Sequence, residues 1–311
     1  MGLTNGRGEL AALSAACLWA IASVVYGVLG QRIPPLQLNL IKGIIAIALL
    51  LITIVISGDF LPTLAPLNLL FLLLSGAAGI GLGDTAFLAA INRLGARRVL
   101  LLGTLAPPMS AIAATIFLQE SLNINAWCGI LLTILGVAWV VTERVSNNGE
   151  GATTQLWPGI GLGLLAAVAN AIGAVFSRAA FTGTNISPLW AALFRLIAGV
   201  LIILIWAFLP NQRNNVFVYP YWQSKRVILA SFLAAFLGTY LGIWLQQTAI
   251  KLTNVGIAST LMQTSPILVI PIAIFMGEKV SLRAIIGVII AIFGISLLAS
   301  ITSPISVRNI L

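Results

Sequence analysis

Three charged residues interrupt apolar stretches of the sequence, and their chemistry indicates a binding site inside a membrane. Lys42 and Arg195 each lie about seven residues into an apolar run, which places them ~10 Å along a helix. Charges at that depth are costly and usually functional. The two cations could hold an anionic group or the carbonyl end of a helix. Alternatively, their long side chains could reach the lipid headgroups by snorkelling.

Asp84 is the acid that the sequence places well inside an apolar run, in the segment GIGLGDTAFLAA. An unpaired carboxylate there could exchange a proton as a substrate moves, which makes a proton a candidate coupling ion. The alternative is an ion pair with the nearby basic loop of Arg93, Arg97 and Arg98.

Polar and amphipathic side chains inside other apolar runs are further candidates for a cavity lining. They are Trp19, Tyr26, Asn170, Ser177, Tyr240, Trp244, Gln246, Gln247 and Gln263. Some of them could instead anchor helices at the interface or form hydrogen bonds between helices. The sequence has no histidine, the commonest general base and metal ligand. Cys17 and Cys128 lie in apolar runs and are predicted to be buried and unpaired, so we expect no metal site and no cofactor.

The composition indicates which elements must position these residues. Of 311 residues, 60% are hydrophobic and 7% are charged, with a mean hydropathy of +1.09, whereas about 25% are charged in soluble domains. Soluble enzymes and nucleic-acid binders are therefore disfavoured, despite the net charge of +9. A spanning helix needs about 20 apolar residues. The sequence predicts an all-α membrane protein with ten such spans, roughly 9–30, 35–57, 67–91, 96–118, 124–142, 157–180, 187–209, 227–250, 255–276 and 281–301.

The spans fall into two copies of one five-helix unit, predicted at residues 8–143 and 157–301 with a linker at 144–156. Residues 108–136 match residues 266–294 at an offset of 158, so that Pro108 pairs with Pro266 and Glu120 with Glu278. Lys42 matches Arg195 at an offset of 153, and Trp19 matches Asn170 at an offset of 151. Because five is odd, the second copy must be inverted, and inverted repeats allow alternating access around a midplane site.

Structural roles are predicted for several matched residues. Glu120 and Glu278 end their spans close to the N-caps Asn123 and Ser281, so each is expected to accept N–H groups at the start of the next helix rather than to contact substrate. Pro108 and Pro266 are predicted to bend a span or to free carbonyls. The spacings Gly79/Gly83 and Gly159/Gly163 predict close helix packing.

Taken together, these segments resemble the EamA-type branch of the drug/metabolite transporter superfamily. The resemblance rests on Trp19, on Lys42 and Arg195 early in their spans, and on three groups of segments: GDTAFLAAINRLGARR at 83–98, the pair APPMSAIAATIFLQE and SPILVIPIAIFMGE, and the pair GILLTILGV and GVIIAIFGI. It implies ten helices in two inverted repeats, a central cavity and transport of small metabolites, commonly export of amino acids or related compounds. Lys42 departs from the more usual arginine. The proton-exchanging acid in the first helix of small multidrug relatives has no counterpart here, because the first span has only Glu9 at its start.

The expected protein is therefore a multi-pass secondary transporter in the plasma or inner membrane, surrounded by lipid, with a small-molecule substrate and no nucleic-acid partner. A channel and an integral membrane enzyme acting on lipid are the alternatives. The enzyme alternative is disfavoured because the sequence shows no clustered set of catalytic side chains. Ten Lys and Arg residues are predicted on the side opposite the termini and four on the terminal side. The positive-inside rule would then put the termini outside, whereas relatives usually have them in the cytoplasm.

Overall fold

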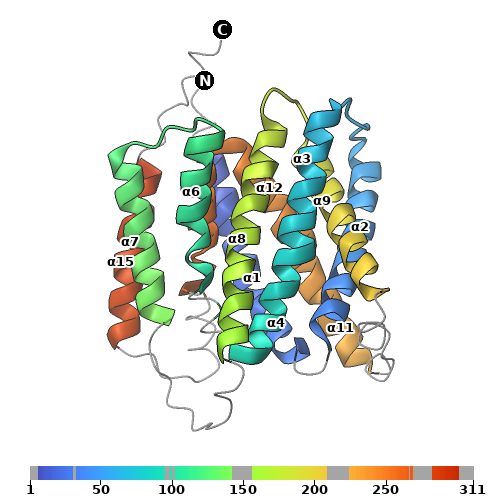
Figure 1. Ribbon diagram of the computed structural model, residues 1–311, viewed down its shortest axis with the longest axis horizontal. Helices are drawn as coiled ribbons and strands as arrows, with labels where there is room; N and C mark the ends of the chain where they lie inside the picture. The colour runs from blue at the N-terminus through green and yellow to red at the C-terminus, as the bar shows by residue number, and fades with distance from the viewer. Residues whose placement is uncertain are drawn as a thin grey trace.

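The computed structural model describes residues 6–30, 33–94, 99, 102–141, 156–208, 224–265, 267–268 and 282–300. Within these ranges the regular elements are helices, arranged as one bundle (Figure 1). They are α1 (Arg7–Gly30), α2 (Pro35–Ser57), α3 (Pro66–Gly76), η1 (Ala77–Asp84), α4 (Thr85–Leu94), α6 (Ala106–Phe117), α7 (Ile124–Val141), α8 (Leu156–Phe181), α9 (Pro188–Ala207), α11 (Lys225–Ala234), η4 (Ala235–Leu241), α12 (Gly242–Leu252), α13 (Val255–Met262) and α15 (Leu282–Ser300).

Six continuous helical segments are long and apolar enough to cross a membrane. They are Arg7–Gly30, Pro35–Ser57, Pro66–Leu94, Leu156–Phe181, Pro188–Ala207 and Lys225–Leu252, in the places of the predicted spans 1, 2, 3, 6, 7 and 8. Spans 4, 5 and 10 correspond to the shorter apolar helices Ala106–Phe117, Ile124–Trp139 and Ile285–Leu297. Span 9 begins as α13, and most of its remainder lies outside the described residues. The chain is therefore a multi-pass membrane protein, and the full number of ten spans stays a prediction.

Two of the long helices contain a π-helical segment near the middle. Between α3 and α4 this segment is η1, and between α11 and α12 it is η4. The repeat offset of 158 places Ala77 on Ala235, so both segments start at equivalent positions of their copies. π-Helical turns are rare and are often found at functional sites, because they break the regular pairing of backbone groups.

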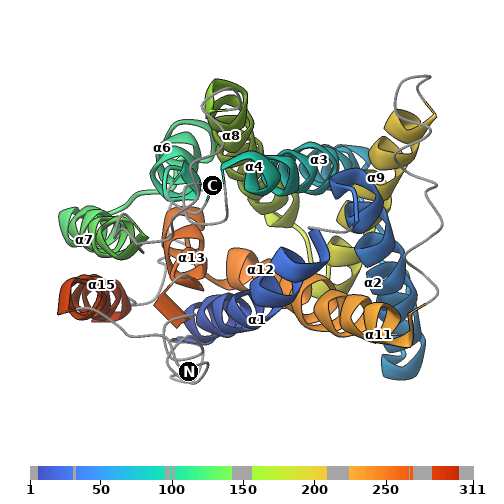
Figure 2. The same cartoon turned by 90° about the horizontal axis from the view of Figure 1, so that it is seen from below.

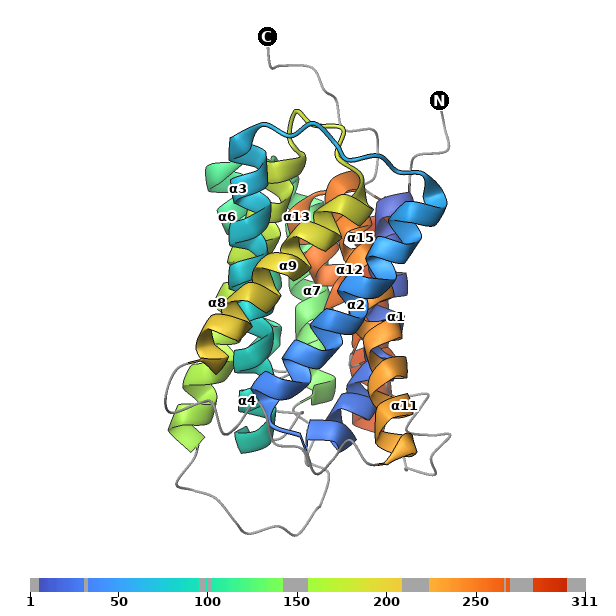
Figure 3. The ribbon, with the colours of Figure 1, turned by 90° about the vertical axis from the view of Figure 1, so that its right-hand side faces the viewer.

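Each π-helical segment packs against helices of the other half of the chain. The first segment, η1, contacts α8 and α9, whereas η4 contacts α1 and α2. The remaining pairs are also reciprocal: α2 lies obliquely along α9 (Figure 3), and α7 lies beside α15 at one edge of the bundle (Figure 2). The two halves are thus interlocked, and the mid-span residues of both halves meet in the centre.

Glycines allow the closest of these approaches. A Cβ atom at Gly76 would overlap the backbone of Arg195, and Gly173 packs directly on Gly79. The Ser75 hydroxyl donates a hydrogen bond of 2.5 Å to the Gly173 carbonyl at the same crossing. The predicted packing role of the Gly79/Gly83 and Gly159/Gly163 spacings is confirmed, since a Cβ at any of the four would come within 3.4 Å of a side chain or backbone atom.

The prediction that the cysteines are buried is wrong. Cys17 on α1 and Cys128 on α7 are both free and exposed. They belong to the outer surface of the bundle, where large apolar side chains such as Leu10 and Leu131 are also exposed. An apolar run in a membrane protein predicts contact with lipid as readily as burial in a core, which is why the sequence misled here.

Candidate functional site

The centre of the candidate site is an ion pair between α2 and the end of η1. Lys42 Nζ lies 2.5 Å from Asp84 Oδ2, and the two side chains are 11% and 27% exposed. Lys42 therefore points into the bundle rather than toward the headgroups. The partner of Asp84 is Lys42 rather than Arg93 of the basic loop, whereas Arg97 and Arg98 lie outside the described residues.

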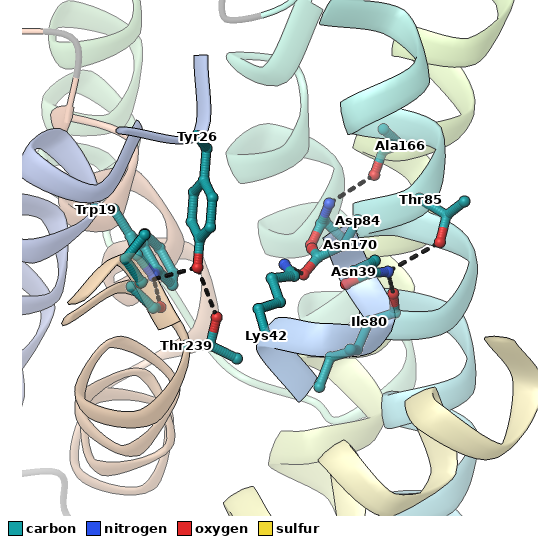
Figure 4. A network of polar contacts seen from close by, with 12 residues as sticks. Trp19, Tyr26, Asn39, Lys42, Ile80, Asp84, Thr85, Ala166, Asn170 and Thr239 are labelled. Atoms are coloured by element: carbon teal, nitrogen blue, oxygen red, sulfur yellow. Dashed lines mark hydrogen bonds and ion pairs between the residues drawn. The ribbon is translucent and has the colours of Figure 1, made fainter. Parts of the chain in front are cut away.

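Two aromatic side chains of α1 bind η4 and the helix before it, and one of them, Tyr26, also contacts Lys42 of the ion pair (Figure 4). Lys42 Nζ lies 5.7 Å from the centre of the Tyr26 ring, close enough for a cation–π contact. The Tyr26 hydroxyl is 2.8 Å from the Ala234 carbonyl and 3.0 Å from Thr239 Oγ1, and it donates to the carbonyl. The Trp19 indole N–H donates to the Gly238 carbonyl at 2.7 Å.

The same carbonyl position receives a side-chain donor in both halves. Gly238 and Ile80 are equivalent at the offset of 158. The Ile80 carbonyl accepts a hydrogen bond of 2.9 Å from Asn39 Nδ2, and the same amide nitrogen also lies 2.9 Å from Thr85 Oγ1. An unsatisfied carbonyl inside a membrane costs several kcal/mol, so these donors stabilise the π-helical segments in their broken form.

Arg195 occupies the place of Lys42 in the second half, but its surroundings differ. The side chain is 3% exposed on α9 and lies beside Gly79 of η1. Its Nη1 donates to Gln246 Oε1 of α12 at 3.2 Å, and its Nε has no hydrogen-bond partner. The position equivalent to Asp84 is Gly242, so a neutral amide one turn further along the helix replaces the acid.

The other predicted lining residues divide between the site and the surrounding packing. Asn170 lies against Gly83, next to Asp84, and donates to the Ala166 carbonyl of its own helix at 2.9 Å. The Tyr240 hydroxyl forms a 2.6 Å hydrogen bond with Thr53 Oγ1.

Trp244 and Gln247 lie further along α12. The Trp244 ring lies 6.1 Å from the ring of Tyr240 and packs against an apolar cluster of α2 and α9. Gln247 is fully buried and accepts a hydrogen bond from the Ser177 hydroxyl. It therefore joins α12 to α8 in this structure, away from the Lys42–Asp84 pair.

Glu120 has a structural role, although not with the helix that the sequence predicted. Its Oε2 accepts the Val255 backbone N–H at 3.0 Å, and its Oε1 accepts Arg178 Nε at 2.6 Å. It thus caps α13 of the other half, whereas α7 is capped by Asn123, whose Oδ1 accepts the Ala126 N–H at 2.8 Å. The contact joins residues 135 apart in the chain, which a local capping pattern cannot reveal.

Of the predictions for Pro108, Pro266 and Glu278, only the one for Pro108 concerns a described residue. Pro108 lies in the first turn of α6, where a proline is tolerated because that N–H has no helical partner. The chain turns at Thr104 and Leu105 just before it, so the predicted span is interrupted beside Pro108, and the freeing of carbonyls there stays a prediction. Pro266 and Glu278 lie outside the described residues.

Sequence reasoning missed four residues that form the network. Asn39 precedes Lys42 by three residues and so lies on the same helix face, a signal that could have revealed it. Thr53 and Thr239 are single hydroxyls in apolar runs and give no comparable signal. Arg178 follows Ser177 at the end of a span, where it resembled an ordinary interfacial cation.

Comparison with known proteins agrees with this architecture. The model of the EamA-like transporter family matches residues 6–142 and 157–300, one match for each half. No curated protein matches this chain significantly. A solved crystal structure of a protein aligns with a TM-score of 0.75 at 16% identity, covering 94% of this chain and 96% of that chain, which shows a shared fold. Because the family match covers both halves, the chain belongs to the EamA-like transporter family of membrane transporters.

Proposed function

We propose that this protein is a secondary transporter that moves small metabolites across the cell membrane by alternating access. The observation that carries the proposal is the pair of repeat-equivalent π-helical segments, η1 and η4, which lie at mid-span beside a partly buried ion pair. In many transporters the binding site is built from interrupted helices near the bilayer midplane, where two repeats meet.

The chemistry of the ion pair favours amino acids or related polar and amphipathic compounds as substrates. A zwitterion can replace both members of the Lys42–Asp84 pair, because its carboxylate would bind the ammonium and its own ammonium would bind the carboxylate. Each charge then exchanges one partner for another, so neither is left unpaired in a low-dielectric interior. Tyr26 beside Lys42 provides an aromatic surface for the rest of the molecule.

Export is the proposed direction, and a proton is the proposed coupling ion. Asp84 is the candidate carrier of this proton, because it lies at mid-span in the described residues and because a substrate ammonium and a proton would compete for the same carboxylate. This arrangement would couple substrate to proton without an acid in the first span. A channel is the competing function, and it differs because it would show neither saturation nor counterflow. An enzyme acting on lipid has no support from the family to which the chain belongs.

The test is to compare metabolites released by cells that overproduce the intact protein with those released by cells producing the Lys42→Ala, Arg195→Ala variant. The control is Lys225→Ala, which removes an exposed cation at the start of α11. Equal amounts in the membrane are verified first. We expect a compound that the intact protein and the control release and the double variant does not.

The released compound is then used for counterflow in proteoliposomes. Saturable counterflow supports a transporter, and flux that rises linearly with concentration indicates a channel. Release that is unchanged in the double variant would remove the two cations from the mechanism. The absence of any released compound would argue against export.

A further inference from the structure

A dense group of polar contacts lies at the end of the bundle where α1 begins, which we call the N-terminal face. Its centre is the guanidinium of Arg178 at the end of α8. Arg178 Nε donates to Glu120, and its Nη1 donates to the carbonyls of Ile250 and Lys251 at 2.9 and 2.8 Å. Glu120 in turn accepts the N–H of Val255. We refer to these contacts as the Arg178 latch.

The latch joins four helices from both halves of the chain. Arg178 ends α8, Glu120 follows α6, and the backbone groups belong to the end of α12 and the start of α13. The side chains of Arg178 and Glu120 are 19% and 11% exposed, so water competes weakly for these hydrogen bonds. Charge-assisted hydrogen bonds of this kind are about twice as strong as neutral ones.

Additional contacts tie the same face together around the latch. Lys251 Nζ donates to the Ile186 carbonyl at 2.7 Å, and the Thr253 hydroxyl donates to Glu9 at 2.9 Å. The Ser187 hydroxyl donates to Asp59 at 2.5 Å, which connects the segment after α2 to the start of α9. All of these contacts bridge helices that are distant in sequence.

On the opposite face the described residues pack by different chemistry. There, one apolar cluster spans α1, α2, α4 and α11, and it consists of Leu29, Ile33, Leu38, Leu88 and Val227. The repeat offset of 151 places Gly27 at the position equivalent to Arg178, so the first half has no arginine there. Among the residues that the structure describes, the latch is therefore a feature of the N-terminal face.

We propose that the Arg178 latch is the gate of the N-terminal face and that it must break before the transport path opens on that side. The inference rests on the proposed alternating access. Opening that face separates the α12–α13 junction from α6 or α8, and either movement breaks hydrogen bonds of Arg178 or Glu120. The described apolar cluster on the opposite face packs without directional bonds, so we expect the specific hydrogen bonds of the latch to hold the N-terminal face closed.

The experiment measures the reaction of buried cysteines with a small water-soluble methanethiosulfonate reagent, using the full chain in lipid nanodiscs. Cys17 and Cys128 are first replaced by alanine, because both are exposed. One reporter is Thr260→Cys on α13, a fully buried position whose hydroxyl bonds only to the Gly256 carbonyl of its own helix. The second is Leu29→Cys in the apolar cluster of the opposite face, where the side chain is 3% exposed.

We expect Arg178→Gln and Glu120→Gln each to raise the labelling rate of Thr260→Cys about tenfold, because each removes a charged hydrogen bond. The combined variant should label at the rate of Arg178→Gln alone, since both changes break one latch. Labelling of Leu29→Cys should stay unchanged or fall, because opening one face leaves the other closed.

The matched control is Asn123→Ala, which removes the cap of α7 near the same face without touching the latch. Melting temperatures are measured for every variant. Faster labelling of Thr260→Cys in Asn123→Ala as well, or equal acceleration at both reporters, would mean general loosening and would overturn the proposal. An unchanged rate in Arg178→Gln would overturn it too. Because labelling needs no substrate, a failed metabolite-release test would leave this result interpretable.

Discussion

The two halves of the chain use the same position for a cation and surround it differently. In the first half, the ammonium of Lys42 is neutralised by Asp84, and both side chains are partly exposed. In the second half, the guanidinium of Arg195 is almost completely buried and donates to the neutral amide of Gln246. At mid-span the described helices therefore carry two cations and one acid. The repeat gives the two cations equivalent positions, but Gly242 lies where the first half carries Asp84, so among the described residues only Lys42 has an acid within ion-pair distance at mid-span.

This difference assigns separate tasks to the two cations. A charge that already has a counter-ion can exchange it for a substrate group, which is what a binding site requires. A buried cation held by an amide has fewer ways to exchange partners, but it raises the positive potential felt by any anion nearby. We therefore expect the first-half pair to bind substrate and the second-half arginine to bias the site toward substrates that carry a carboxylate.

The largest effect is expected from Lys42→Met, which removes the cation and keeps an apolar chain of similar length. Asp84 would then lose the ammonium that lies 2.5 Å from it, and we expect the protein to lose about 3 kcal/mol of stability together with metabolite release. Thermal unfolding in nanodiscs measures the loss of stability.

Lys42→Met combined with Asp84→Asn provides the control, because it removes both charges. We expect this variant to regain most of the stability and none of the transport. If the single variant were as stable as the intact protein, the ion pair would not be the feature that distinguishes the first half.

An intermediate effect is expected from Gly242→Ala. Gly242 is the residue of the second half that is equivalent to Asp84 of the first half. The new methyl group would overlap the Trp19 indole and disturb its hydrogen bond to Gly238, at a cost of about 1–3 kcal/mol. Gly161→Ala on α8 is the matched control, because the space beside Gly161 is open. Because alanine favours a helix more than glycine does, Gly161→Ala should leave the melting temperature unchanged or raise it. An equal change in both variants would show that the contact with Trp19 does not exclude a side chain at Gly242.

The smallest effect on stability is expected from Arg195→Met. Replacement of a buried charge by an apolar side chain of similar size is often neutral or stabilising, so we expect a change within about 1 kcal/mol. Transport should nevertheless weaken for substrates that carry a carboxylate. Uptake of the released metabolite by proteoliposomes at several concentrations measures this, and a raised KM with an unchanged maximal rate is the expected pattern. A loss of stability as large as that of Lys42→Met would abolish the contrast between the two halves.

The sequence predicted the helices better than it predicted the partners within them. Six long spans followed directly from apolar length, and the equivalence of Lys42 and Arg195 followed from the repeat. The π-helical segments did not, although the glycines around 76–83 marked a place where the backbone can deviate. The length of an apolar run is the same whether or not one turn contains an extra residue. Apolar length therefore could not distinguish an α-helix from a helix with a π-helical segment.

The errors about the partners of acidic residues share one physical cause, which is that local patterns do not encode contacts between distant segments. Glu120 looked like a cap for the next helix and caps α13 of the other half instead. Asp84 was expected to be free or to pair with the basic loop, whereas its partner lies on the preceding span.

The glycine crossings have a consequence for which parts of the protein can move as one body. At Gly76 and Gly173 the backbones of α3, α8 and α9 are in direct contact, and Ser75 pins that crossing with a hydrogen bond. Such contacts resist sliding far better than flexible side chains would, so these three helices are expected to travel together even though α3 comes from the first half. The unit that was duplicated in the sequence is therefore not the unit that moves, and a half-chain expressed alone would lack the surface against which its own broken helix is held.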